Sequence, residues 1–423
     1  PVSLQRCPDG IDDCFFQKNV PDHFNQDLAN TYAISIPFPQ AIPKKAAIDE
    51  QYCRQFTKGK CGVCKKLCPV GAINFEMEDE FINEEVGAII VATGFDLFDH
   101  SWYGEYGGGR FVDVITGLQY ERILSASGPF GGQIKRPSDG REPKNIVFVS
   151  CVGSRDASVE RPYCSGVCCM YIAKQAILTR NHLPDANCYV FYMDIRSPGK
   201  NYDEFVRRAQ REYGVQYIRG RVGKIYPKNS KLVVQGADTL LGVQVVVEAD
   251  LGVLATGVEA SRGARELAEK LRISCDQHGF FMESHPKLRP VETNTAGVYL
   301  AGVCQGPKDI PSSVAQGSAA AAKVQVLFSR DSIETSPQVA LINEHACVAC
   351  GKCLQVCPFG AIQWKEQRDG TQKAEVLPSV CQGCGLCNAT CPPKAVQLQH
   401  CTDNQILAEI DVLLDDFVEK LGL

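Results

Sequence analysis

The sequence lacks several features that would assign it to common classes of protein. Its formal net charge is only −5, so it has no excess of basic residues for nucleic acid or an anionic membrane surface. No apolar run reaches the roughly 18–20 residues that a transmembrane helix needs. The seven histidines include no pair at metal-ligand spacing and no Ser–His–Asp arrangement. The glycine fingerprint G-x-G-x-x-G, which binds dinucleotide phosphates, is also absent, so we do not expect an NAD(P) site.

Cysteine, in contrast, is abundant, with 22 residues in the 423-residue chain. Residues 347–358 and 381–392 both read C-x2-C-x2-C-x3-C-P, the spacing of two-cluster ferredoxins. In those proteins the first three cysteines of each run bind one [4Fe–4S] cluster, and the fourth binds the other cluster. The spacing therefore predicts one cluster held by Cys347, Cys350, Cys353 and Cys391, and a second held by Cys357, Cys381, Cys384 and Cys387.

Two other interpretations of these cysteines are disfavoured. Zinc sites rarely use this triple spacing, and a disulfide framework is typical of small secreted chains. Cysteines in cluster spacing instead indicate a reducing compartment, and we expect the cytoplasm of an anaerobic cell.

A third cysteine run near the start of the chain predicts half of an inserted ferredoxin-like module in residues 1–82. Its first three cysteines would bind a cluster whose fourth ligand lies elsewhere. Cys68, the fourth, would serve a cluster whose other ligands lie upstream, because the opening Pro-Val resembles the sequence after the last cysteine of such a run. Cys7 and Cys14 are either replacement ligands or free thiols. The run C-x7-C-x2-C-x3-C-P consists of Cys53, Cys61, Cys64 and Cys68.

Three apolar segments have the order found in two-domain flavin reductases. Residues 86–95 (VGAIIVATGF) and 251–257 (LGVLATG) read as strands that end in Ala-Thr-Gly, and 297–306 (GVYLAGVCQG) reads as a third strand. Apolar strands of this kind are buried on both faces of a parallel sheet. The third strand leads into an Ala-rich helix at 310–325, whose N-terminal amides would face a flavin. One such strand alone is as often an ordinary strand exit, so the interpretation depends on the repeated order.

Between the two Ala-Thr-Gly segments lies a βαβ-like domain at about 143–256, which begins with a strand at 145–150. Where a nucleotide-binding domain would have its glycines, this chain has four cysteines, which are either core residues or ligands of another cluster. A lysine in the following helix, Lys174, would by itself be a surface residue. The four cysteines, called the cysteine quartet below, are Cys151, Cys164, Cys168 and Cys169.

The remaining patterns indicate scaffold. We expect strands at 191–197 and 215–226, a hairpin turn at 228–230 and a helix at 203–214. Residues 404–422 have apolar residues at helical spacing, and such an amphipathic helix would dock on this chain or on a partner.

Several long and unusual stretches resemble the heterodisulfide reductase A subunit family. They are CVGSRD, YCSGVCCMYIAKQA, FYMDIRSPGKNYDEF, AGVCQGPKDIPSSVAQG and the closing double ferredoxin motif. The resemblance implies a thioredoxin-reductase-like FAD fold with an inserted and a C-terminal ferredoxin domain, and flavin-based electron bifurcation. It also implies that the cysteine quartet binds an unusual cluster and that Lys174 lies near flavin N5.

The chain departs from the family pattern in two respects. The family's N-terminal cluster domain, its first FAD fingerprint and the first half of the inserted ferredoxin are not found in this sequence. In addition, Val303 and Cys304 occupy the position where many flavin reductases have an Asp. The flavin must therefore be bound by backbone amides and Gly302 instead.

These patterns predict an α/β protein with a thioredoxin-reductase-like FAD domain, a second Rossmann-like domain and α+β ferredoxin-like modules. The predicted FAD-binding residues are Thr93, Gly94, Lys174, Gly302, Gln316 and Gly317, with Lys174 also the predicted catalytic residue. The predicted parts are a partial inserted ferredoxin-like domain at 1–82, a discontinuous FAD-binding domain at 83–142 and 257–338, the second Rossmann-like domain with the quartet at 143–256, a two-cluster ferredoxin domain at 339–400, and a helix at 401–423.

We expect such a subunit to split electron pairs between a high-potential acceptor and ferredoxin. Its partners would be heterodisulfide reductase B- and C-like subunits, hydrogenase or formate dehydrogenase linker-like chains, and a second copy of itself. The alternatives are a cluster-only wiring subunit and the same subunit in a quinone-interacting or acyl-CoA-reducing complex. An ordinary NAD(P)H flavin reductase is disfavoured by the missing glycine fingerprint.

Overall fold

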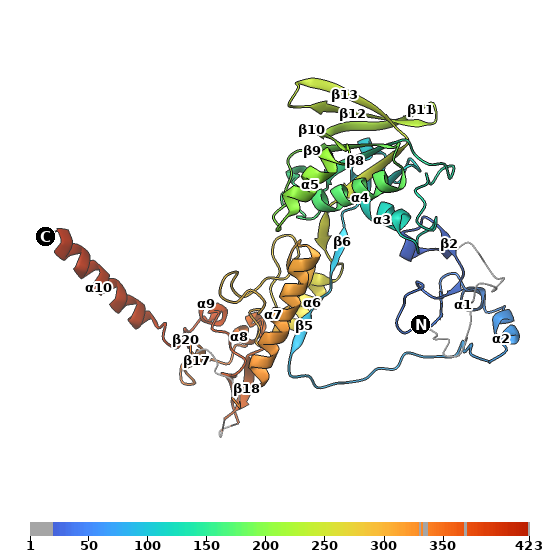
Figure 1. Ribbon diagram of the computed structural model, residues 1–423. Coiled ribbons are helices and arrows are strands. Elements are labelled where there is room, and N and C mark those ends of the chain that lie inside the picture. Colours follow the sequence, from blue (N-terminus) through green and yellow to red (C-terminus); the bar gives the residue numbers. More distant parts are fainter. Residues whose placement is uncertain (1–19, 330, 333–336, 368–369, 422–423) are drawn as a thin grey trace. The chain divides into compact units, whose positions relative to one another are not determined.

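The structure, a computed structural model, describes residues 20–329, 331–332, 337–367 and 370–421 (Figure 1). It forms two compact units, the first made of residues up to 85, 96–259 and 307–309, and the second of 86–95, 260–306 and 310 onward. The predicted roles of Cys7 and Cys14 fall outside the described residues. Among the described residues, no helix has both the length and the apolar character that a bilayer crossing requires.

The core of the first unit is a five-stranded, all-parallel sheet in the order β10-β9-β8-β14-β7. Successive residues of the central strand β8 alternate between its faces, because Ile146 and Phe148 pack on the helical side while Val147 and Val149 pack on the other. An apolar run covered on both faces is typical of a parallel sheet, and the predicted α/β class is confirmed. The strands are β7 (Val114–Thr116), β8 (Asn145–Val152), β9 (Asn187–Tyr192), β10 (Gln216–Arg219) and β14 (Leu251–Thr256).

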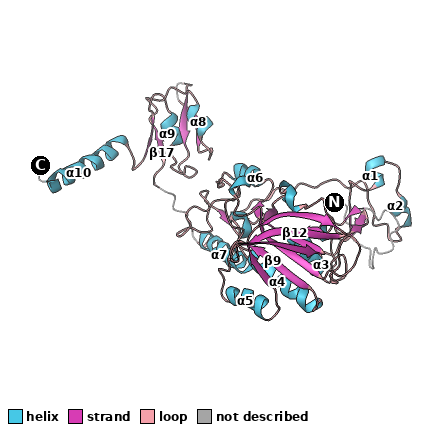
Figure 2. Ribbon diagram, turned by 90° about the horizontal axis from the view of Figure 1, so that it is seen from above, coloured by secondary structure: helices cyan, strands magenta, loops and turns pink. Residues whose placement is uncertain are grey.

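Three helices cover one face of this sheet, and a small antiparallel sheet covers the other (Figures 1 and 2). The antiparallel strands are joined by the predicted hairpin turn, in which Asn229 and Ser230 have φ of +50° and +61°, as a two-residue type I′ turn requires. The elements are α3 (Gly117–Leu124), α4 (Cys168–His182), α5 (Tyr202–Arg211), β11 (Val222–Lys228), β12 (Lys231–Asp238), β13 (Val243–Ala249), and the 3-10 helices η3 (His100–Trp102), η4 (Gly104–Tyr106) and η5 (Ala157–Val159).

Three sequence-based assignments differ from the structure in this unit. The single strand predicted at 215–226 is divided into β10 and β11, which belong to different sheets. The strand predicted at 191–197 ends at Tyr192, and residues 193–197 form a loop. Residues 114–124, grouped by sequence with the FAD-binding segment 83–142, form β7 and α3 instead, and Ile115 lies beside Val253 of β14. The short buried strand β7 therefore extends the sheet of the second Rossmann-like domain.

Residues 20–85 of the first unit form short elements around a small core. Ile34, Ile48 and Ile73 are buried there, and cysteines of the N-terminal run pack against them. Strands β1 and β2 pair antiparallel, as do β3 and β4. The elements are β1 (Val20–Pro21), η2 (His23–Asn25), β2 (Asn30–Thr31), β3 (Ile34–Ser35), β4 (Ala47–Ile48), α1 (Arg54–Lys58) and α2 (Val63–Leu67).

The second unit contains a two-stranded parallel sheet of β5 (Ile89–Val91) and β16 (Val298–Leu300). Ile89 and Ile90 are 37% and 45% exposed, so the expectation that this strand is buried on both faces is wrong for β5 in the described structure. The predicted Ala-rich helix is α7 (Ile310–Phe328), in which only Ala320 is buried. The other elements here are α6 (Ala264–Leu271) and η6 (Gly302–Gln305), whereas most residues of β6 (Phe95–Leu97) and β15 (Val258–Ala260) belong to the first unit.

The ferredoxin-like part of the second unit has two antiparallel strand pairs and two short helices around a core that includes cysteines. The helix predicted at 404–422 is α10 (Asp403–Leu421), and its apolar residues Ile406, Leu407 and Ile410 are exposed. The elements are β17 (Ala340–Ile342), α8 (Lys352–Val356), β18 (Ile362–Glu366), β19 (Gln372–Val376), α9 (Leu386–Thr390) and β20 (Val396–Leu398).

Candidate iron–sulfur and flavin sites

Two cavities lie in the ferredoxin-like part, and each is lined by cysteines from both C-terminal runs. The free space within each is about 20 Å³, comparable to the room that a single water molecule needs, so the cysteine linings and not the volumes identify the two sites. The first is lined by Cys357, Cys381, Cys384 and Cys387, and the second by Cys347, Cys350, Cys353 and Cys391, the same two sets that the spacing predicts.

One local structure, used twice, builds these cavities. Gly351, with φ of +72°, precedes the five-residue helix α8, which carries Cys353 and ends at Cys357. Gly385, with φ of +79°, precedes α9 in the same way, and that helix ends at Cys391. A left-handed conformation costs glycine little, so the chain can turn sharply just before each helix. The turn allows nearby cysteines to line one cavity while the helix carries the last cysteine to the other.

Burial makes two of these thiols, those of Cys353 and Cys387, harder to ionise. Burial raises the pKa of Cys353, and it raises the pKa of Cys387 to about 11. Metal ligation needs thiolates, so a bound group must bring positive charge that offsets this cost. The described residues contain no set of three or more His, Cys, Asp or Glu side chains placed for a single metal ion.

The N-terminal cysteine run repeats the local structure of the C-terminal runs. Gly62, with φ of +80°, precedes the five-residue helix α2, which ends at Cys68 in an extended conformation. Cys53 and Cys64 pack with Cys68 against the small core of this part, while Cys61 is exposed. The four cysteines therefore lie in one module.

The cysteine quartet lies at the C-terminal end of the parallel sheet and the start of α4. Cys151, near the end of β8, is buried and has φ of +59°, which is uncommon for a residue with a side chain. Cys168 and Cys169 open α4. Burial, followed by the charges of other quartet members, raises the pKa of Cys151 to about 11 and that of Cys168 to about 12. Both thiols are therefore harder to ionise than free thiols, and a cationic group among them would offset that cost.

Two charged residues that the sequence analysis missed lie beside the quartet. Arg155 pairs with Asp194 through both terminal nitrogens of its guanidinium group, and Nη2 is 3.2 Å from Oδ2. The backbone N–H of Arg196 donates a hydrogen bond to Cys169 Sγ over 3.4 Å. These charged residues lie in the unusual stretches CVGSRD and FYMDIRS, which could have indicated their role, but the second stretch was interpreted as a strand.

Lys174 lies on α4 and forms an ion pair with Glu121 of α3. Gln175, the next residue, is buried and also donates to Glu121, over 3.2 Å. The Lys174 side chain is 46% exposed, so its ammonium group remains accessible from solvent. The sequence analysis missed Glu121, which precedes its partner by 53 residues.

The five other predicted FAD-binding residues lie in the second unit, at the ends of β5 and β16 and on α7. Thr93 Oγ1 accepts a hydrogen bond from Ser261 over 3.2 Å. The backbone N–H of Gly302, where β16 ends, donates to Gln316 Oε1 over 2.7 Å. A side chain added at Gly94 or Gly317 would meet nothing within 4 Å, so a flat ring could approach the backbone there. These residues fit a flavin, whereas Lys174 belongs to the first unit.

Comparison with known proteins finds one matching domain family and several relatives that match most of the chain. Residues 346–395 match the 4Fe-4S dicluster domain, so this part is an iron–sulfur domain. The chain is 46% identical over 402 residues to the A subunit of the H(2):CoB-CoM heterodisulfide,ferredoxin reductase of Methanothermobacter marburgensis, covering 95% of this chain and 60% of that protein. The chain belongs to the heterodisulfide reductase A subunit family. It is also 44% identical over 398 residues to the iron-sulfur A subunit of the CoB–CoM heterodisulfide reductase of Methanocaldococcus jannaschii, covering 94% of this chain and 60% of that protein.

The aligned region includes nearly all of this chain but a smaller share of each relative. The chain spans about 60% of the length of the first heterodisulfide reductase A subunits that it matches. A solved thioredoxin reductase from T. acidophilum is also similar, with 15% identity and a TM-score of 0.38, over 57% of this chain and 66% of that one. The family membership confirms the resemblance that the sequence stretches indicate.

Proposed function

We propose that this chain is an electron-transfer subunit that carries [4Fe–4S] clusters and FAD in an oxidoreductase complex of heterodisulfide reductase type. The observation that carries the proposal is the pair of cavities in which the fourth cysteine of each C-terminal run joins the other run's cysteines. This cross-over is the arrangement of two-cluster ferredoxins, whose only chemistry is the movement of single electrons.

Two further sets of cysteines would bind additional clusters. Cys53, Cys61 and Cys64 would hold three corners of one cluster, and Cys68 would serve another cluster. The cysteine quartet would hold a further cluster, because its members lie between the end of β8 and the start of α4, and Cys151 keeps an uncommon backbone conformation that places its thiol. Burial in the core around Cys168 would keep water away from that cluster.

The flavin would lie against the ends of β5 and β16 and the N-terminal half of α7. A bound flavin supplies the exchange between two-electron and one-electron transfer. Thr93, Gly94, Gly302, Gln316 and Gly317 would position the ring system, with the helix N-terminus favouring negative charge on it. The family resemblance also implies a role for Lys174 as a cation that favours negative charge on the reduced ring.

The names of the relatives support a proposal about which molecules accept the electrons. They name the CoB–CoM heterodisulfide and ferredoxin, and one relative from Methanosarcina acetivorans, 41% identical over 345 residues, is named ferredoxin/F420H2-dependent. We propose that this chain splits electron pairs between such a disulfide and ferredoxin. It would do so in a cytoplasmic, anaerobic complex with B- and C-like subunits, with linker-like chains of a hydrogenase or formate dehydrogenase, and with a second copy of itself.

The test is the metal and flavin content of the complex purified without oxygen. We expect about 16 iron atoms for each copy of this chain, with matching acid-labile sulfide, for four [4Fe–4S] clusters, and one FAD. Serine at Cys164 and Cys168 should remove about four of those iron atoms. Zinc in place of iron would overturn the proposal, and so would unchanged iron content when serine replaces Cys350 and Cys384.

A second candidate function is a wiring subunit that relays electrons through clusters without a working flavin. The exposure of β5 and of nearly all of α7 favours it, because a complete flavin domain would cover these elements. The two candidates differ in flavin content, since a wiring subunit gives a complex with full iron and no flavin bound to this chain. Photolabelling of this chain by an azido-FAD analogue would then be absent.

A further inference from the structure

Two loops that end neighbouring strands are joined beside the cysteine quartet by one ion pair. Arg155 lies in the loop after β8, four residues beyond Cys151, and Asp194 lies in the loop after β9. The guanidinium and carboxylate groups meet side by side, with both carboxylate oxygens engaged. This bidentate geometry fixes the position of both charges more firmly than a single contact would.

The same two loops contact the quartet directly. The backbone N–H of Arg196 donates to Cys169 Sγ over 3.4 Å, and that sulfur lies 3.9 Å from the carbonyl oxygen of Asp194. Arg155 and Asp194 carry charges of opposite sign, so they would act in opposite directions on a charge held by the quartet sulfurs.

A purely structural role explains this ion pair poorly. The Arg155 side chain is 21% exposed and that of Asp194 is 47% exposed, so solvent screens part of their attraction and limits what the pair adds to stability. On the quartet side, however, Cys151 is buried, so the field of the two charges is less screened there than in water. The arrangement is better suited to adjusting an electron carrier than to holding the fold.

We propose that the Arg155–Asp194 pair sets the reduction potential of the cluster bound by the cysteine quartet. Reduction adds one electron to the cluster and needs no other reactant than the electron donor of the complex. A neighbouring positive charge stabilises the reduced form and raises the potential, and a negative charge lowers it. The inference rests on the proposed role of the quartet as cluster ligands.

The experiment is a redox titration of the assembled complex, followed by electron paramagnetic resonance. The signal of this cluster is first assigned by its loss in Cys164→Ser. We expect R155Q to shift its potential to more negative values and D194N to shift it to more positive values. The double variant should lie between them, near the wild-type value. R155K keeps the positive charge and should stay close to wild type.

Arg161 provides a matched control in the same loop region. Its guanidinium Nε is 2.6 Å from Glu259 Oε1, so its charge is paired with a carboxylate outside the Arg155–Asp194 pair. R161Q should therefore leave the potential unchanged, and melting temperatures of all variants report on folding separately.

Shifts of the same sign in R155Q and D194N, or no shift, would overturn the inference. So would loss of cluster iron in both R155Q and R155K, because the pair would then hold the loops together and not tune the cluster. Failure of the proposed function looks different, since Cys164→Ser would then leave the iron content unchanged.

Discussion

The backbone N–H of Ala72 donates a hydrogen bond to Cys68 Sγ over 3.3 Å. The same contact joins Ala361 to Cys357 over 3.3 Å and Ala395 to Cys391 over 3.2 Å, so all three C-P-x-x-A sequences fold alike. An N–H donor aimed at sulfur favours the charged thiolate that a metal requires. Cys68 thus has the local structure of the fourth cysteine in the dicluster domain.

In each C-terminal run the fourth cysteine lines the cavity of the other run. Double serine variants should therefore lose different amounts of iron, depending on which two cysteines are replaced. Serine at both Cys357 and Cys384 alters one cavity only, so the double variant should lose about four iron atoms. Serine at both Cys357 and Cys350 alters both cavities and should lose about eight. Iron analysis of the anaerobically purified complex measures this difference. If each run instead held its own cluster, the Cys357/Cys350 variant would lose only one cluster.

Replacement of Gly317 by leucine tests the flavin face of α7. Nothing lies within 4 Å of the added Cβ, so folding should be unharmed, and removal of a helical glycine should stabilise the helix by about 1 kcal/mol. A leucine side chain would occupy the space we propose for the ring, so FAD content should fall severalfold while iron content stays. Fluorescence of released flavin gives the measurement.

Ala319→Leu is the control for Gly317→Leu. Ala319 is exposed and lies two residues further along the helix, about 200° around its axis. This variant should therefore keep its FAD. Equal flavin loss in both variants, or full flavin in Gly317→Leu, would contradict a flavin on this face.

The cluster motifs could be read from sequence because their geometry is local. Three of four ligands lie within seven residues, and the glycine before each helix, Gly351 or Gly385, also belongs to the motif. Spacing alone therefore identified the cysteines that line each cavity. Even the exchange of the fourth ligand follows from the helix that carries Cys357 or Cys391 away from its own run.

Contacts between distant segments were missed for the opposite reason. Arg155 and Asp194 are 39 residues apart, and they meet only because β8 and β9 are neighbours in the sheet. Lys174 likewise meets Glu121 because α3 packs beside α4. The apolar pattern of β5 correctly indicated a strand, but it could not say which elements would cover that strand. Burial depends on partners, and a pattern in one strand does not contain them.

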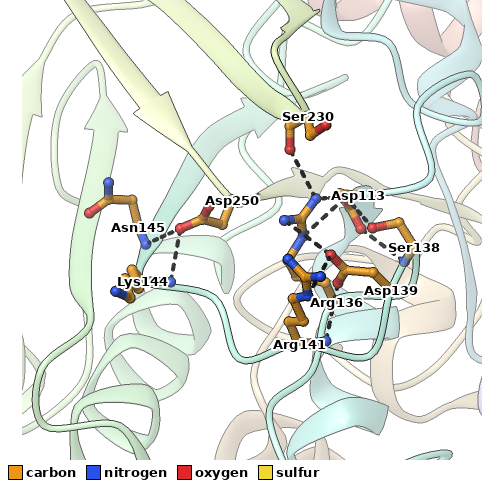
Figure 3. A network of polar contacts seen from close by, with 9 residues as sticks. All are labelled: Asp113, Arg136, Ser138, Asp139, Arg141, Lys144, Asn145, Ser230 and Asp250. Atoms are coloured by element: carbon orange, nitrogen blue, oxygen red, sulfur yellow. Dashed lines mark hydrogen bonds and ion pairs between the residues drawn. The ribbon is translucent and has the colours of Figure 1, made fainter.

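The buried carboxylate of Asp113 anchors the loop that follows α3, and its loss should destabilise the first unit. Asp113 Oδ2 accepts from Arg136 Nη2 and from the Ser138 hydroxyl, both over 2.7 Å (Figure 3). Asp113→Ala would leave the mostly buried Arg136 without this partner, so we expect a loss of about 3–5 kcal/mol in the free energy of unfolding. Urea unfolding of the full chain, followed by circular dichroism, measures it.

Asp139→Ala is the control for Asp113→Ala, because Asp139 also faces Arg136, but over 3.5 Å and with its side chain 32% exposed. A weak, more exposed pair should cost less than about 1 kcal/mol. Similar losses in the two variants would show that the charge on Arg136, and not the buried hydrogen bonds of Asp113, determines the effect.

The stability supplied by Asp156 should disappear in acid. Its carboxylate accepts hydrogen bonds from the Ser158 hydroxyl over 2.6 Å, Arg221 over 2.9 Å and the Tyr103 hydroxyl over 2.7 Å. Donors from these three residues, Ser158 first, hold the pKa of Asp156 far below its usual range. Because the folded pKa is depressed, the stabilisation is complete above the unfolded pKa of about 3.9 and declines as the pH falls toward the folded pKa.

We therefore expect Asp156→Asn to lower the free energy of unfolding by about 1.5–3 kcal/mol at pH 7 and by progressively less below about pH 4. Urea unfolding at pH 7 and at pH 3 gives the comparison. Tyr103→Phe is the matched variant, because it removes one donor but keeps the carboxylate, so it should cost about 1 kcal/mol at pH 7. If the Asp156→Asn deficit were as large at pH 3 as at pH 7, the carboxylate charge would not be the source of the stabilisation, and the residue would act through packing alone.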